Sequence, residues 1–119
     1  MTPCYQLSTS IDSATGAARI AETLVAERLA ACVQVTGPMT SVYRWEGDLQ
    51  RSEEWLCTAK TSEAALPAAM RRIRALHTYE QPEILATLIT AGDPGYLDWV
   101  RAESVSSSPP STPPTLEVR

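Results

Sequence analysis

Residues 31–61 read ACVQVTGPMTSVYRWEGDLQRSEEWLCTAKT, and this stretch decides the fold. Two long runs rich in Val, Thr and aromatic residues flank Glu46-Gly47-Asp48, which is a turn signal. The pattern predicts a long hairpin with strands over about 31–45 and 49–61. Gly37-Pro38 interrupts the first run, and because proline cannot donate to a strand ladder, we expect a β-bulge and an edge strand there.

Amphipathic patterns on both sides of this hairpin predict helices. One helix is expected from Ala14 to Leu29, with Asp12-Ser13 as its cap. A second is expected within residues 62–76, with its regular part beginning near Pro67 because proline suits a first helical turn. The face that the first helix is expected to bury comprises Ala17, Ile20, Ala21, Leu24 and Val25.

Shorter segments complete the order of elements. Extended runs at 5–11 and 82–90 predict two more strands, and Asp93-Pro94 predicts the start of a short last helix. The face that this helix is expected to bury comprises Tyr96, Trp99 and Val100. The resulting order is β-α-β-β-α-β plus a terminal helix. It predicts an α+β, ferredoxin-like antiparallel sheet with both main helices on one face.

The opposite face of such a sheet has no helix to cover it. Trp55, Cys57 and Ala59 share one face of the third strand, and we expect Trp55 to lie on the uncovered face among apolar neighbours. An exposed apolar surface of that kind marks an interface. The sequence therefore predicts self-association, which a monomer in sedimentation would contradict.

Composition indicates one small globular domain. The chain has 119 residues, of which 44% are hydrophobic, so a second domain has no room. We expect residues 1–102 to fold and the Pro- and Ser-rich segment 103–119 to form a flexible tail. The net charge of −4 disfavours nucleic acid as a partner, and no apolar run is long enough to predict a membrane span.

Cysteine usage favours a reducing location. Cys4, Cys32 and Cys57 are too few and too widely spaced for a disulfide scaffold, and the first residues do not resemble a signal peptide. We therefore expect a cytoplasmic protein. No cysteine has a neighbouring base in the sequence, so no nucleophile and base pair predicts an enzyme.

The segment His77-Thr78-Tyr79-Glu80-Gln81-Pro82-Glu83 is the densest cluster of chemically competent side chains. Imidazole and carboxylate groups ligate borderline metals, but no second histidine or thiolate nearby completes a set. His77 equally suits the carboxyl end of the preceding helix, where a cation is favoured. Cys32 suits a buried position as well as a ligand site. Lys60, the only lysine, suits a solvated position as well as a functional site.

Separated pieces of the chain match a known family in order across residues 4–101. They are Ala21–Leu24, Leu29–Val33, Gly37, Ser41–Gly47, Lys60-Thr61, His77–Ile84 and Tyr96–Val100. In these pieces the chain resembles the CutA divalent-cation tolerance family. The resemblance implies a ferredoxin-like subunit in a homotrimer, with tolerance of or response to divalent metal ions, copper being the usual candidate, and no established catalysis.

The resemblance also implies where ligands bind. The residues that would hold a metal ion are His77 and Glu80, with Cys32 added as a residue that could complete a site left with one histidine. Those that would line a ligand cleft between subunits are Tyr43, Trp45, Lys60, Tyr79 and Glu83. Copper-binding members carry a cysteine and a further histidine where this chain has Ser8 and Leu76, and their usual Asn and Pro are here Gln34 and Thr78.

Two other functions remain open at this point. A trimeric sensor similar to the PII proteins would hold an anionic small molecule near Lys60. RNA-recognition modules share the same strand order and would stack bases on Tyr5 and Trp55. The negative charge and the missing basic aromatic consensus disfavour the RNA alternative.

Overall fold

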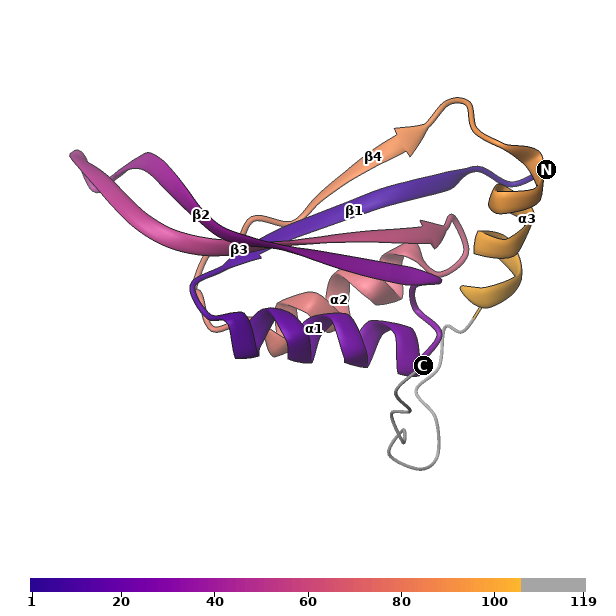
Figure 1. The fold of residues 1–119 in the computed structure, drawn as a ribbon, viewed down its shortest axis with the longest axis horizontal. Helices are drawn as coiled ribbons and strands as arrows, with labels where there is room; N and C mark the ends of the chain where they lie inside the picture. The colour runs from indigo at the N-terminus through magenta and orange to yellow at the C-terminus, as the bar shows by residue number, and fades with distance from the viewer. Residues whose placement is uncertain (106–119) are drawn as a thin grey trace.

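A four-stranded antiparallel sheet carries two helices on one face (Figure 1). The structure is a computed structural model that describes residues 1–105. Its elements are β1 (Cys4–Ile11), α1 (Ala14–Ala26), β2 (Cys32–Trp45), β3 (Asp48–Ser62), α2 (Leu66–Leu76), β4 (Leu85–Ile89) and α3 (Pro94–Glu103). The strand order β2-β3-β1-β4 confirms the predicted α+β, ferredoxin-like arrangement.

The core lies between the sheet and helices α1 and α2. Alternate residues of β1 and β3 point toward the helices, and apolar residues of both helices pack on them. The buried core includes Leu7, Ile11, Ala17, Ile20, Leu24, Cys57, Ala59 and Ile73. Trp55 packs against this cluster, so the prediction that it lies on the uncovered face is wrong. Strand alternation shows which residues share a face, but not which face the helices cover.

The uncovered face is mainly polar. Register places Ser8, Thr58 and Gln34 side by side across three strands, and Gln6 beside Lys60 in the next row. Leu85 of β4, which pairs with Ser8, is exposed on this face, but the described part of the face lacks the apolar cluster around Trp55 invoked to predict self-association. Exposed apolar side chains gather elsewhere, on the hairpin of β2 and β3.

This hairpin is confirmed and extends past the other strands (Figure 1). Glu46 and Gly47 form its turn with φ of 49° and 84°, the conformation that matches the twist of paired strands. The register shifts between Thr36 and Met39, so the predicted bulge at Gly37-Pro38 on an edge strand is confirmed. Strand β1 pairs with β3 only from Trp55 onward. We call the remainder, Met39–Trp45 with Asp48–Glu54, the hairpin arm.

Helix α1 begins as predicted and ends earlier. The Ser13 side chain accepts a 3.0 Å hydrogen bond from the Gly16 N–H, but the helix stops at Ala26 because Arg28 adopts a φ of 60°. Val25 is 41% exposed, so its predicted burial is wrong. In α2, Pro67 occupies the first turn, which confirms the predicted start.

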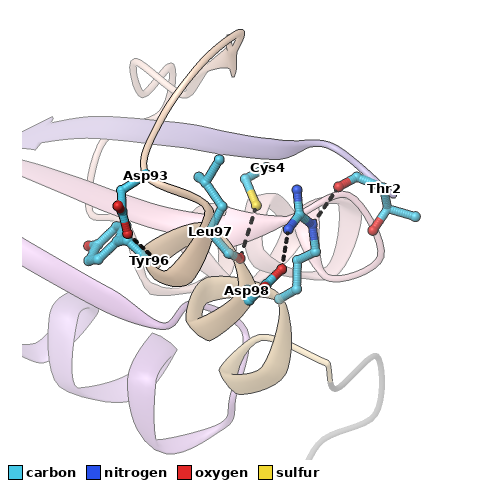
Figure 2. A network of polar contacts seen from close by, with 7 residues as sticks. Thr2, Cys4, Asp93, Tyr96, Leu97 and Asp98 are labelled. Carbon is cyan, nitrogen blue, oxygen red and sulfur yellow. Dashed lines mark hydrogen bonds and ion pairs between the residues drawn. The ribbon is translucent and has the colours of Figure 1, made fainter.

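Helix α3 closes one end of the sheet and is tied to the N-terminus (Figure 2). Asp93 caps it by accepting the Tyr96 N–H at 3.0 Å, and Arg101 donates to the carbonyl of Thr2 at 2.7 Å. Val100 is buried, but Tyr96 and Trp99 are 44% and 41% exposed, so their predicted burial is wrong.

The folded part continues to the end of the described residues. Ser104 is fully buried and accepts a hydrogen bond from the backbone of Ser62 at 3.0 Å, two residues beyond the expected boundary at 102. The remainder of the predicted tail, 106–119, lies outside the described residues. None of the helices within residues 1–105 has the length and apolar character needed to cross a membrane.

Candidate functional site

A cavity of about 630 Å³ lies between the hairpin arm and the segment that follows α2. Three carboxylates line it, those of Glu54, Glu80 and Glu83, and no Lys or Arg of residues 1–105 is among its lining residues. The other lining residues are Ser10, Met39, Ser41, Val42, Tyr43, Trp45, Tyr79 and Gln81. The charge of this lining favours a cation.

Glu54 is the buried member of the three carboxylates. Its side chain belongs to β3 and is 7% exposed, whereas Glu80 and Glu83 are exposed. The Tyr79 hydroxyl donates a 2.6 Å hydrogen bond to its Oε2 atom. Burial, and then the hydrogen bond to Glu54 and its negative charge, raise the pKa of Tyr79. The phenol therefore stays protonated and remains a donor to the carboxylate.

His77 fixes the segment that carries Tyr79 and Glu80. It lies at the carboxyl end of α2, where its Nδ1 atom accepts a 3.1 Å hydrogen bond from the Tyr79 N–H. Since Nδ1 accepts, the ring proton must be on Nε2, which donates to the Ser10 carbonyl at 2.8 Å. The rings of His77 and Tyr79 also pack edge to face at 4.6 Å. Both imidazole nitrogens are thus engaged within the subunit.

The structure brings most of the predicted cleft residues together. Tyr43 and Trp45 line the cavity from the hairpin arm, and Tyr79, Glu80 and Glu83 line it from the segment after α2. Lys60 is absent from the lining and donates instead to the Gln34 side chain at 2.9 Å.

Cys32 lies apart from His77 and Glu80. Cys32 pairs with Lys60 of β3. Ser10, whose carbonyl His77 contacts, pairs with Leu56, which lies four residues from Lys60 along β3. At about 3.3 Å per residue, this separates the two along the strands by about 13 Å. The Cys32 Sγ atom instead lies 3.4 Å from the Tyr96 hydroxyl, and this hydrogen bond is the main cause that raises the pKa of Tyr96 to about 12.

Within residues 1–105, no three His, Cys, Asp or Glu side chains lie close enough together to hold a metal ion. The predicted metal set of His77, Cys32 and Glu80 is therefore not assembled inside one subunit. Sequence reasoning also missed Glu54. Its position in an extended run gave no signal of burial, because the segment after α2 covers it only in three dimensions.

Comparison with known proteins covers nearly all of the described chain. The CutA1 divalent ion tolerance protein family matches residues 5–103. The chain is 48% identical to the divalent-cation tolerance protein CutA of Thermus thermophilus over 82 residues, which are 69% of this chain and 80% of that protein. It is 39% identical to mouse Protein CutA over 82% of this chain, but spans only 56% of the mouse protein.

Solved structures agree with these matches. The Thermus thermophilus divalent cation tolerance protein superposes with a TM-score of 0.82 at 40% identity, over 85% of this chain and 98% of that one. CutA1 from the psychrotrophic bacterium Shewanella sp. SIB1 superposes with a TM-score of 0.84 at 34% identity, over 89% and 100%. With the same topology and a match across residues 5–103, the chain belongs to the CutA1 divalent ion tolerance protein family.

Proposed function

We propose that the protein is a homotrimeric, non-catalytic responder to divalent cations that binds such an ion at the mouth of the acidic cavity. The observation that carries the proposal is the lining of three carboxylates, to which the described part of the chain adds no Lys or Arg. Glu80 and Glu83 are exposed at this lining and are the proposed ligands. A lining of this charge concentrates cations and repels anions.

The donor set decides which ions fit. Carboxylate oxygens suit Mg²⁺, Mn²⁺ and Ca²⁺, whereas imidazole and thiolate suit copper and zinc. His77 already uses both nitrogens and Cys32 lies at the other end of the sheet. We therefore propose an oxygen-ligated divalent ion. The resemblance implies copper instead, so binding of Cu²⁺ is compared with binding of an oxygen-ligated ion.

The ligand set is proposed to be completed by neighbouring subunits. Within residues 1–105 the hairpin arm pairs only with itself, and a two-stranded hairpin alone is marginal in water. It exposes Val42, Trp45 and Leu49 by 54%, 50% and 71%. Other copies covering this arm would bury those side chains and bring more donors to the cavity. Sedimentation should give three times the chain mass of 12.9 kDa.

The proposal also covers catalysis and location. A protein without catalysis fits a family named for ion tolerance. A cytoplasmic location fits three free thiols, although the names of relatives include chloroplastic and periplasmic forms. The PII-like alternative requires an anion near Lys60. Lys60 does not line the acidic cavity, so the cavity does not support that alternative.

Calorimetric titration with Mn²⁺ and Cu²⁺ tests the proposal. Wild-type protein should bind Mn²⁺ with a saturable heat, and Glu80→Gln or Glu83→Gln should weaken it, because each loses a charged ligand. Glu63→Gln is the matched control, since Glu63 is exposed outside the cavity. Equal Mn²⁺ binding by all four proteins, or none by any, would overturn the site. Electron paramagnetic resonance of bound Cu²⁺ shows whether nitrogen is a ligand.

A further inference from the structure

The cavity is far larger than a single metal ion requires. Its volume of about 630 Å³ lies in the range of small-molecule sites, about 300–1,000 Å³, and apolar and aromatic side chains form much of its wall. From its inner part we infer a second ligand class: a small protonated alkylamine. Its ammonium group binds the Glu54 carboxylate, and its carbon stem lies against Tyr43 and Trp45. This binding goes beyond the metal response proposed above, and it requires that the inner part of the cavity stays open in the assembled oligomer.

The inner carboxylate supplies the charge that an ammonium group needs. Glu54 is 7% exposed, and among the described residues only Tyr79 donates a hydrogen bond to it. The described residues form no ion pair with it, and its Oε1 atom is not among their buried unpaired polar atoms, so that oxygen remains accessible from the cavity that Glu54 lines. An ammonium group carries three N–H donors and a positive charge, so it satisfies the Oε1 atom that Tyr79 leaves unbonded.

The aromatic wall suits the carbon stem and the charge together. Tyr43 and Trp45 line the cavity from β2, and they are 42% and 50% exposed. An aromatic face attracts a cation within about 6 Å, most strongly when the ring is Trp. Met39 and Val42 of the same lining add apolar surface for methylene groups.

The spread of the carboxylates also favours an extended cation in the inner part. Glu54 is buried, while Glu80 and Glu83 are exposed on the segment after α2. No three potential metal ligands converge within residues 1–105. An alkylamine needs only one close carboxylate, and the two outer charges raise its local concentration.

Calorimetric titration of the assembled full chain with n-butylammonium chloride tests this inference. We expect saturable binding by the wild-type protein and none by 1-butanol, which has the same stem without the charge. Tetramethylammonium, which has no N–H donor, should bind at least about tenfold more weakly than n-butylammonium, the scale of a charge-assisted hydrogen bond.

Variants locate the binding. Glu54→Gln should lower n-butylammonium affinity by about tenfold or more, and Trp45→Leu by about threefold to tenfold. Glu63→Gln, at an exposed position outside the cavity, should bind like the wild-type protein. Circular dichroism establishes that each variant is folded. If Glu54→Gln does not fold, Trp45→Leu decides the result, provided that sedimentation shows the same oligomer as the wild-type protein.

Three results would overturn the inference: no saturable heat with n-butylammonium, equal binding of 1-butanol, or affinity unchanged in both Glu54→Gln and Trp45→Leu. A cavity filled by a neighbouring subunit would give the first result. A parallel Mn²⁺ titration keeps the two proposals apart. If Glu80→Gln loses Mn²⁺ binding and the wild-type protein binds no amine, the metal site alone is supported. If the wild-type protein binds the amine but no Mn²⁺, the amine site alone is supported.

Discussion

The Tyr79 hydroxyl and the Glu54 Oε2 atom lie 2.6 Å apart and join the two walls of the cavity. Glu54 belongs to β3 in the hairpin arm, and Tyr79 belongs to the segment after α2. His77 anchors that segment to the carbonyl of Ser10 at the end of β1. The cavity therefore depends on contacts between residues far apart in the chain.

Replacing Tyr79 tests the strength of this join. Tyr79→Phe removes the donor and leaves a buried carboxylate without its hydrogen bond, so the free energy of unfolding should fall by about 2 kcal/mol. Urea denaturation measures the change. The control is Tyr43→Phe, because the Tyr43 hydroxyl makes only a 3.4 Å exposed contact with Ser52. Equal stability of the Tyr79 variant and the wild-type protein would contradict the role of the bond.

The hydrogen bonds of His77 predict its tautomer. Nitrogen-15 chemical shifts of the ring at neutral pH should show the proton on Nε2, because Nδ1 accepts from the backbone of Tyr79. His77→Ala should lower stability by about 1–2 kcal/mol, since it loses both bonds. A proton on Nδ1 would show that the segment is held differently.

The ion pair between Glu27, which follows α1 as its C-cap, and Arg72 of α2 should contribute measurably to stability. Arg72 contacts both carboxylate oxygens of Glu27, which is 8% exposed, at distances from 2.9 to 3.2 Å. Arg72→Ala leaves that carboxylate unpaired and should cost about 2–3 kcal/mol in chemical denaturation. Arg71→Ala, at an exposed position on the same helix, should change stability by less than about 0.5 kcal/mol. Similar losses in the two variants would rule out a specific role for the pair.

Burial of Cys57 predicts a loss of stability at alkaline pH. Burial raises the pKa of its thiol from 9.0 to about 11, so the folded protein keeps a proton that the unfolded chain releases. The unfolded state therefore binds fewer protons between about pH 9 and 11, and the free energy of unfolding falls as the pH rises through this window. Cys57→Ala should show a shallower fall over the same range. Identical slopes would mean that the thiol does not contribute.

Sequence patterns predicted the elements better than their surroundings. The turn at Glu46-Gly47, the cap at Ser13 and the start of α2 at Pro67 depend on local backbone chemistry, so each is readable from a few residues. The resemblance across separated pieces of the chain correctly identified the family, and five of its predicted site residues line one cavity.

What the sequence could not show depends on long-range packing. The burial of Glu54 results from a segment that returns to the hairpin 25 residues later, and no local pattern records that contact. Trp55 faces the helices because α1 and α2 pack on its side of the sheet. Strand alternation does not show which side of a sheet the helices cover. Cys32 of β2 pairs with β3, and His77 contacts Ser10 of β1. Only the strand register shows that Cys32 and His77 lie near opposite ends of the sheet.

The central claim, a divalent cation held by the outer carboxylates of the cavity, is tested most directly by an anomalous difference map from crystals of the full chain soaked in Mn²⁺. The account predicts a peak in the cavity of the assembled oligomer, with Glu80 and Glu83 oxygens at coordination distance, and no such peak in Glu80→Gln crystals. A peak on His77 or Cys32 instead, or none in the wild-type crystals, would contradict it.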